Sequence, residues 1–177
     1  MNSSLNCAGF LADLVWALQT VVCEGPQFSL SRVIKDQRVY LIGNGGSATV
    51  AAHIANDFVK AGLRAHALSD PAVLTCMAND YGYDRVFSEQ LKRHLERRDW
   101  VIAISSSGKS RNIHEAVQLA KVYGAKVVTL SGFDADNPLR SMGDTNYWLP
   151  SHNYGIVEIV HLAILHGIVN PGETSAA

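Results

Sequence analysis

Two groups of histidine and carboxylate side chains have spacings that suit metal binding or proton transfer. The first is His53 and Asp57, which are four residues apart and on a helix would lie on one face, about one turn from each other. An imidazole and a carboxylate in this arrangement can share a metal ion or a proton. The same pair is also common as a plain hydrogen bond on a helix surface, so the spacing alone leaves both interpretations open.

The second group lies near the C-terminal end, where Glu158, His161 and His166 are the only ionisable side chains between Ile156 and Val169. All other residues of this stretch are apolar or glycine, and a helix that is apolar nearly all round is buried. Buried ionisable groups need partners, and at about 100° per residue Glu158 lies roughly 60° from His161 and roughly 80° from His166. We interpret Glu158 and His166 as functional residues and His161 as a histidine of the core.

Small and hydroxyl-bearing residues follow two short apolar segments, residues 39–42 and 101–104. The first segment leads into Gly43-Asn44-Gly45-Gly46-Ser47, and the second leads into Ser105-Ser106-Ser107-Gly108-Lys109-Ser110. A strand that passes through such a loop into a helix offers backbone N–H groups, hydroxyls and the positive helix end to an anion. Two of these loops in one small domain predict a phosphorylated ligand.

Two nucleotide-binding motifs are weaker explanations of these loops. Residues 43–48 fit the loose dinucleotide pattern GxGxxA, but the acidic residue that this pattern needs, Asp70, serves equally well as a helix cap. Residues 108–110 match the end of a P-loop, yet the leading glycine of that motif would fall at Ala103, inside the strand. A plain polar turn is disfavoured because five of the six residues from Ser105 to Ser110 are glycine or carry a hydroxyl.

Strands and helices alternate along the rest of the chain. Apolar segments predict strands at 39–42, 64–68, 100–104, 126–130 and 146–149, and helical periodicity predicts helices at 47–61, within 71–97, at 110–123 and at 154–169. An amphipathic helix in the N-terminal segment, residues 1–36, precedes them. We therefore expect one α/β domain over residues 1–177, with a five-stranded parallel sheet between two helical layers, an extra N-terminal helix and a disordered tail at 171–177. Ligands of such sheets bind beyond the carboxyl ends of the strands, where both loops fall.

The composition of the chain indicates which kinds of binding partner and which cell compartment to expect. The chain has 177 residues, with 15 basic against 16 acidic side chains, so no basic surface for nucleic acid is expected. Its three cysteines, Cys7, Cys23 and Cys76, have no paired spacing and suit a reducing compartment. Neither a secretory signal nor a membrane span fits the N-terminal residues, so we expect a cytoplasmic protein with no membrane partner.

Together these motifs resemble the phosphoheptose isomerases of the sugar isomerase (SIS) domain superfamily, whose fold is flavodoxin-like. The resemblance covers nearly the whole chain and includes the two loops, His53-x-x-x-Asp57, Glu158-x-x-His161 followed by His166, and residues 79–83, Asn-Asp-Tyr-Gly-Tyr. It implies a homotetramer with active sites between subunits, a sugar phosphate held by the serine-rich loop, and one zinc ion per subunit.

The resemblance also implies roles for single residues. His53, Asp57, Glu158 and His166 would bind the metal, with Asp57 as catalytic base and His166 as acid. The family's usual pattern has glutamate at the position of Asp57 and glutamine at that of Glu158, so Asp57 has a shorter reach and Glu158 adds a negative charge. The substrate-binding residues would be Asn44, Gly45, Ser47, Asp80, Ser105, Ser106, Ser107 and Ser110.

The reaction implied is the conversion of sedoheptulose 7-phosphate to D-glycero-D-manno-heptose 7-phosphate through an enediol. Two alternatives remain at this point. One is a non-catalytic regulator or assembly factor that binds a phosphosugar on the same scaffold, and the other is an isomerase of another phosphosugar. The four metal-type ligands favour an enzyme, because binding alone needs no base.

Overall fold

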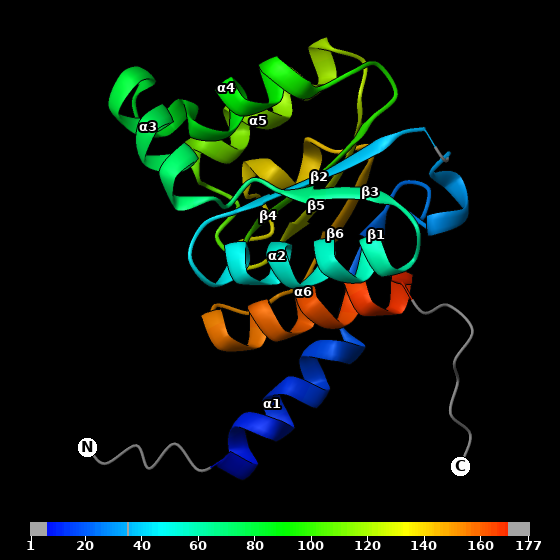
Figure 1. The fold of residues 1–177 in the computed structure, drawn as a ribbon. Helices are drawn as coiled ribbons and strands as arrows, with labels where there is room; N and C mark the ends of the chain where they lie inside the picture. The colour runs from blue at the N-terminus through cyan, green and yellow to red at the C-terminus, as the bar shows by residue number, and fades with distance from the viewer. Residues whose placement is uncertain (1–6, 35, 170–177) are drawn as a thin grey trace.

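The structure, a computed structural model, describes residues 7–34 and 36–169 (Figure 1). It is an α/β fold in which one sheet lies between two layers of helices. The expected tail at 171–177 lies outside the described residues. In chain order the elements are α1 (Cys7–Gln19), β1 (Val22–Glu24), η1 (Leu30–Arg32), β2 (Arg38–Gly43), α2 (Gly46–Lys60), β3 (Arg64–Ala67), α3 (Pro71–Tyr81), η2 (Tyr83–Arg85), α4 (Val86–His94), β4 (Trp100–Ser105), α5 (Arg111–Val122), β5 (Lys126–Ser131), η3 (Pro138–Ser141), β6 (Thr145–Trp148) and α6 (Tyr154–Val169).

Within residues 7–34 and 36–169 the sheet has six strands, in the order β1-β6-β5-β4-β2-β3. The five predicted strands are present and run parallel, but the predicted count of five was wrong by one. The additional strand, β1, pairs antiparallel with β6, with Val22 opposite Trp148. The N-terminal segment 1–36 is therefore not wholly helical: its helix ends at Gln19, and β1 and η1 follow.

The central strands β2, β4 and β5 are mostly apolar, and they are buried over nearly their whole length because both faces of the sheet are covered. Successive residues point to opposite faces, so Leu41 joins a core with α2 and α6, while Ile42 joins a second core with α4 and α5. Figure 1 shows α2 and α6 side by side on one face and α3, α4 and α5 on the other. This arrangement places the β2–α2 and β4–α5 loops next to each other at the carboxyl ends of neighbouring parallel strands.

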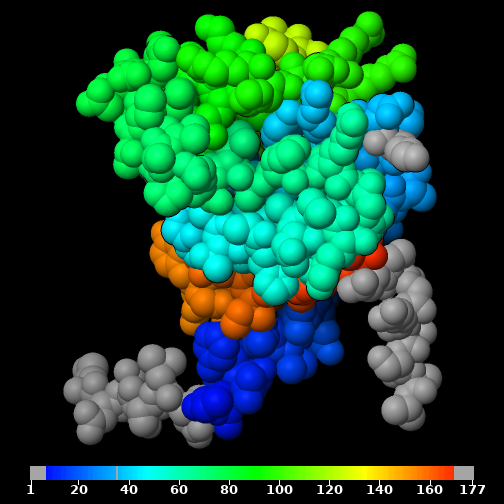
Figure 2. Space-filling view, in the orientation of Figure 1, coloured from blue at the N-terminus to red at the C-terminus, as the bar shows by residue number. Residues whose placement is uncertain are grey.

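Helix α1 lies outside these three layers. It packs on α6 through Phe10, Leu14 and Ala17, and it extends away from the sheet below α6 in Figures 1 and 2. Its other face exposes apolar side chains to between 45% and 56%, namely Leu11, Val15, Trp16 and Leu18. No helix in the described part of the chain is long and apolar enough to cross a membrane.

Candidate functional site

The two small-residue loops surround one pocket of about 240 Å³ at the carboxyl edge of the sheet. The wall from the first loop continues into the N-terminal turn of α2, and the wall from the second loop follows directly from β4. Seven of the eight predicted substrate-binding residues thus lie around one cavity. The lining residues are Asn44, Gly45, Gly46, Ser47, Ile104, Ser105, Ser106, Ser107, Ser110, Tyr154 and Glu158. We call this cavity the loop pocket.

Hydroxyl groups of the serine-rich loop are available for a ligand. Ser105 Oγ and Ser110 Oγ lie 3.1 Å apart, so a hydrogen bond closes the loop across its base. Ser106 Oγ is buried and has no hydrogen-bond partner within the described residues. Because a buried hydroxyl without a partner is costly, this group is suited to an anion that enters the pocket.

The serine-rich loop is supported from behind by Asn137, whose side chain is 3% exposed. Its Nδ2 lies within hydrogen-bond distance of Ser131 Oγ and of the carbonyl oxygens of Gly132 and Asp134. Gly108, with φ of +63°, approaches so closely that a Cβ there would lie 1.9 Å from Asn137 Oδ1. The tight turn of the loop therefore requires glycine at this position.

Lys109 belongs to the serine-rich loop but does not line the loop pocket. Its ammonium group donates to Asp134 Oδ2 at 2.8 Å. This hydrogen bond raises the pKa of Lys109 and lowers the pKa of Asp134. The positive charge thus stabilises the outside of the loop, and the loop pocket depends on hydroxyls and backbone N–H groups.

Glu158 lies between the loop pocket and a neighbouring groove. It lines the loop pocket, and with His53 and Leu162 it also lines the groove, which has a volume of about 350 Å³. A Cβ on Gly46 would lie 2.2 to 2.4 Å from the Glu158 carboxylate. The absence of a side chain at Gly46 therefore makes room for this carboxylate beside the first loop.

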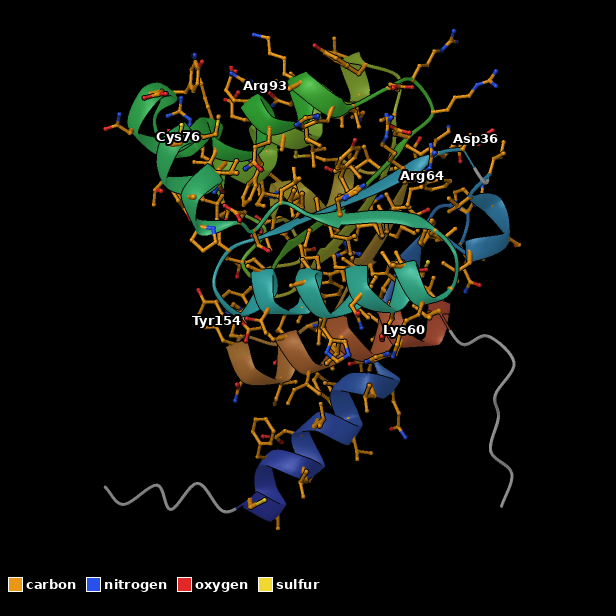
Figure 3. All side chains as sticks on the ribbon, in the orientation of Figure 1. Asp36, Lys60, Arg64, Cys76, Arg93 and Tyr154 are labelled. Carbon is orange, nitrogen blue, oxygen red and sulfur yellow. The ribbon has the colours of Figure 1, made fainter. Side chains whose placement is uncertain are left out.

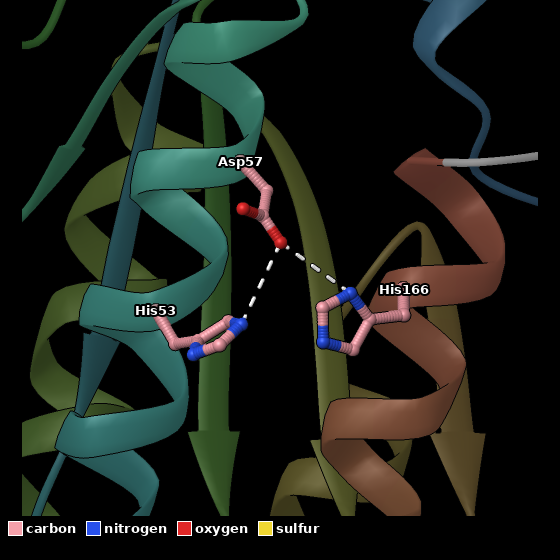
Figure 4. A group of neighbouring side chains, drawn as sticks. All are labelled: His53, Asp57 and His166. Carbon is pink, nitrogen blue, oxygen red and sulfur yellow. Dashed lines mark ion pairs between the residues drawn. The ribbon is translucent and has the colours of Figure 1, made fainter.

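A second cluster lies along the facing sides of α2 and α6 (Figure 4). Asp57 Oδ2 lies 3.6 Å from His53 Nε2 and 3.4 Å from His166 Nδ1, and the two imidazole rings meet edge to face at 5.0 Å. One ligand atom from each of the three residues lies within 4.8 Å of the others. Two imidazole nitrogens and one carboxylate oxygen are a donor set that fits Zn²⁺, and three protein ligands leave a coordination position open.

Glu158 is not part of this cluster, so the predicted set of four ligands is not brought together within the chain. It precedes His166 by eight residues on α6, which corresponds to about 12 Å along the helix axis. Since the carboxylate lies against Gly46, it faces the loop pocket and not His166. An angle of about 80° around α6 would bring the two side chains near one another only if they also lay at the same height, and they lie about two turns apart.

The loop pocket and the metal-type cluster lie at different heights along α2. Asp57 follows Gly46 by eleven residues, about 16 Å along the helix axis. In Figure 3, Tyr154 marks the loop-pocket end of the α2–α6 pair and Lys60 marks its opposite end. Within a single copy of the chain, Asp57 is therefore distant from the first loop, although His53 of the same cluster lines the groove that adjoins the loop pocket.

Asp80, the eighth predicted substrate-binding residue, does not line the loop pocket. It lies on exposed α3, where its carboxylate accepts hydrogen bonds from Cys76 Sγ and Asn79 Nδ2. Tyr154 and Gly46, which do line the pocket, were not predicted. Gly46 was within the first loop, but no residue pattern pointed to Tyr154.

His161 is a core histidine, as interpreted from the sequence. It is fully buried, and neither ring nitrogen has a hydrogen-bond partner of ordinary geometry within the described residues. Burial lowers the pKa of His161 to about 4, and the nearby backbone of Ser131 opposes this shift only in part. The imidazole is therefore neutral at pH 7.

A larger cavity, of about 560 Å³, lies away from both loops between α3, α4 and the first parallel strands. Its two guanidinium groups already have acidic partners, since Arg38 pairs with Glu96 at 2.7 Å and Arg93 pairs with Glu89 at 3.0 Å. Size alone therefore does not make it the better candidate site.

The fold and the two loops define the class of protein. The model of the SIS domain family matches residues 27–132, which include both loops and the first four parallel strands. Proteins with similar sequences then identify a family within the SIS domain proteins. The chain is 36% identical over 141 residues to a phosphoheptose isomerase of Fusobacterium nucleatum, covering 76% of this chain and 72% of that one. It is 40% identical over 136 residues to a phosphoheptose isomerase of Thermodesulfovibrio yellowstonii, covering 73% and 67%.

The chain therefore belongs to the phosphoheptose isomerase family of SIS domain proteins. Solved structures of phosphoheptose isomerases have the same fold as this chain. The phosphoheptose isomerase GmhA of Neisseria gonorrhoeae has a TM-score of 0.77 at 29% identity and covers 93% of this chain and 95% of its own. A phosphoheptose isomerase of Francisella tularensis shares the fold, with a TM-score of 0.80 at 24% identity over 96% and 97% of the two chains.

Proposed function

We propose that this protein is an isomerase that converts sedoheptulose 7-phosphate to D-glycero-D-manno-heptose 7-phosphate. The observation that carries the proposal is Asp57, whose carboxylate lies between two imidazoles from facing helices in a chain that also has a loop pocket suited to phosphate. A phosphate pocket alone would suit a binding protein equally well. A carboxylate flanked by two histidines adds the acid, base and metal ligands that a proton transfer beside a carbonyl requires.

The loop pocket holds the phosphate end and the neighbouring hydroxyls of the sugar. In this proposal Ser105, Ser106, Ser107 and Ser110 donate to phosphate oxygens, and the helix end at Ser47 adds backbone N–H groups. Asn44 and Gly45 contact the sugar. These contacts orient the substrate and contribute no chemical step of their own.

The carbonyl end of the sugar reacts beside the cluster. Asp57 takes the proton from C1, next to the C2 carbonyl, while His166 gives a proton to the carbonyl oxygen, which yields an enediol. The reverse transfers, with the proton from Asp57 placed on C2 and a hydroxyl proton taken back by His166, form the aldose. No atom is gained or lost, and both residues return to their starting states.

The donor set of His53, Asp57 and His166 fits a zinc ion, and we propose one per subunit. When bound, the ion would polarise the substrate carbonyl as a Lewis acid. Asp57 Oδ2 faces both imidazoles, so in this proposal Oδ1, which accepts a 3.4 Å hydrogen bond from Asn56 Nδ2, takes part in proton transfer through its other lone pair. Glu158, outside this set, is assigned to the loop pocket instead.

We also propose a homotetramer with active sites at subunit interfaces. Two observations support it. Asp57 lies about 16 Å along α2 from Gly46 of the loop pocket, and in this proposal the cluster of another copy completes the site at the pocket. In addition, α1 exposes four large apolar side chains on one face, and α6 exposes Tyr154 and Ile159. Exposed apolar faces of this kind mark contacts between proteins.

Subunit mixing tests the shared site. We would combine a Ser107→Ala variant with an Asp57→Asn variant, each inactive or nearly so alone. If sites are shared, mixed oligomers contain some intact pairs of pocket and cluster, and activity returns. If each chain carries a complete site, the mixture stays as inactive as its components.

Finally, we propose that residues 1–177 form a single domain that acts in the cytoplasm. Two helical layers share one continuous sheet, and the three cysteines are free thiols, of which Cys7 and Cys76 are exposed. Free exposed thiols are typical of reducing compartments.

The decisive assay follows sedoheptulose 7-phosphate and a panel of other ketose phosphates by NMR and records any aldose product. His166→Gln should abolish turnover while the far-UV circular dichroism spectrum stays unchanged. Full activity of this variant would contradict the assignment of His166. Binding of a phosphosugar without turnover by the wild-type protein would favour a regulator, and turnover of a different ketose phosphate would change the substrate.

A further inference from the structure

The side chain of Asn44 forms a closed hydrogen-bonded pair with the side chain of Asn112. Asn44 Nδ2 donates to Asn112 Oδ1 at 2.9 Å, and Asn112 Nδ2 donates back to Asn44 Oδ1 at 2.9 Å. Asn44 belongs to the β2–α2 loop, while Asn112 lies in the first turn of α5, just after the serine-rich loop. Asn112 is 3% exposed, so the pair is anchored in the protein interior and ties the two loops together.

Tyr83 makes a third hydrogen bond to the same side chain. Its hydroxyl donates to Asn44 Oδ1 at 2.9 Å. Tyr83 begins η2, directly after Gly82, which ends α3 with φ of +82°. The residue is 58% exposed, so core packing does not explain why its hydroxyl lies at Asn44. The segment that the resemblance singled out at residues 79–83 therefore reaches the loop pocket through a tyrosine hydroxyl.

Counting donors and acceptors shows what remains of the Asn44 side chain for a ligand. An amide oxygen has two lone pairs, and an amide nitrogen has two hydrogens. Both lone pairs of Oδ1 are used, by Asn112 and Tyr83, and one hydrogen of Nδ2 is used by Asn112. Since Asn44 lines the loop pocket, it can offer a ligand one N–H donor and no acceptor.

We propose that Tyr83 and Asn112 are positioning residues that hold Asn44 so that its one remaining N–H faces an oxygen of the sugar. The inference rests on the function proposed above and deepens it. Neither Tyr83 nor Asn112 lines the loop pocket, and their hydrogen bonds keep the Asn44 amide from rotating and presenting its oxygen. In this arrangement the segment 79–83 contributes to the loop pocket through Tyr83, whereas Asp80 of the same segment lies away from the pocket.

Removal of the Tyr83 hydroxyl is the least disruptive test, because the ring is exposed and the change deletes one atom. We expect Tyr83→Phe to weaken binding of sedoheptulose 7-phosphate, measured by titration calorimetry, by about threefold to tenfold, the range of one neutral hydrogen bond. KM should rise by a similar factor while kcat changes less than twofold. Binding of inorganic phosphate, which uses the serine-rich loop, should stay unchanged.

Tyr81→Phe is the matched control. Tyr81 belongs to the same segment, but its hydroxyl accepts from Arg93 and does not reach the loop pocket. Loss of the Tyr81 hydroxyl should leave the affinities for sedoheptulose 7-phosphate and for inorganic phosphate unchanged. An equal loss of sugar phosphate affinity in Tyr81→Phe and Tyr83→Phe would overturn the proposal, because the effect would then belong to the stability of the segment.

Two variants of Asn44 complete the test. Asn44→Asp keeps both acceptors for Asn112 and Tyr83 but has no N–H, so it should lose more sugar phosphate affinity than Tyr83→Phe. In an Asn44→Ala background, Tyr83→Phe should have no further effect, since the two residues act through one side chain. An undiminished effect of Tyr83→Phe in that background would overturn the inference.

A readout without substrate separates this inference from the proposed reaction. The side-chain NH₂ signals of Asn44 in ¹⁵N-labelled protein, assigned by their loss in Asn44→Ala, should shift and exchange faster in Tyr83→Phe but not in Tyr81→Phe. If the wild-type protein neither binds nor converts sedoheptulose 7-phosphate, the proposed function fails, and these signals still decide the positioning. Unchanged signals in Tyr83→Phe would refute it.

Discussion

Gly108→Ala measures how strongly the serine-rich loop depends on the support behind it. Two costs follow from the structure. An alanine at φ of +63° costs about 1–2 kcal/mol of backbone strain. Its Cβ would also lie 1.9 Å from Asn137 Oδ1, so the nearly buried Asn137 side chain must move.

Displacement of Asn137 disrupts hydrogen bonds on both of its polar atoms. Nδ2 gives up Ser131, Gly132 and Asp134, and Oδ1 gives up the backbone N–H of Arg140. Two or three lost bonds at about 1 kcal/mol each add about 2–3 kcal/mol. The total expected decrease in the free energy of unfolding is therefore about 3–5 kcal/mol.

Gly62→Ala is the control for the backbone cost alone. Gly62 has φ of +87°, but a Cβ there would meet nothing within 4 Å. Urea denaturation, followed by circular dichroism at one fixed protein concentration, should show the Gly108 variant about 2–3 kcal/mol less stable than the Gly62 variant. The Gly108 variant should also lose inorganic phosphate binding, and the Gly62 variant should not. Equal free energies of unfolding for the two variants would refute the assigned role of Asn137.

Three other predictions concern protonation, metal binding and space in the site. Burial lowers the pKa of His161 to about 4, so the unfolded chain binds a proton at this residue more readily than the folded protein does. The free energy of unfolding should therefore fall by up to about 3 kcal/mol as the pH drops from about 6.5 to 4. His161→Leu should remove this part of the acid dependence in urea denaturation at pH 7 and pH 5, and parallel losses in both proteins would contradict it. Asp57→Asn should weaken zinc retention by at least tenfold in elemental analysis, whereas Asp13→Asn, on exposed α1, should retain the metal. Equal zinc content in the wild-type protein and in both variants would refute the metal-type cluster. Gly46→Ala should weaken sugar phosphate binding by displacing the Glu158 carboxylate, and its effect should shrink in a Glu158→Ala background; the same effect in both backgrounds would show that Glu158 is not involved.

Most of the parallel part of the fold was predictable because strands rich in apolar residues, such as β2 and β4, alternate with helices along the chain. Strand β1 was not, since three residues, Val22 to Glu24, carry too little periodicity to separate a strand from the end of the preceding helix. Its conformation is determined by pairing with β6, a contact between residues far apart in the chain.

The site was predictable where residues share one helical turn. The four-residue spacing of His53 and Asp57 placed both side chains on one face of α2, where Asp57 contacts both His53 and His166. That His166 is a functional residue stays a prediction. The position of Glu158 was not predictable from angle alone, because a difference of eight residues also moves a side chain two turns along the axis. The partners of Asn44 were missed because Tyr83 and Asn112 come from elements whose proximity depends on the fold.

The short outer strands of the sheet also bear on how copies of the chain associate. An unpaired strand edge is a template for further pairing, and long flat edges invite open-ended aggregation. Here β1 has three residues and ends at Glu24, while β3 has four and begins at exposed Arg64. Neither edge offers a long run of backbone groups, so continuous sheets across subunits are disfavoured. The proposed oligomer would therefore form through other surfaces, such as the exposed apolar face of α1.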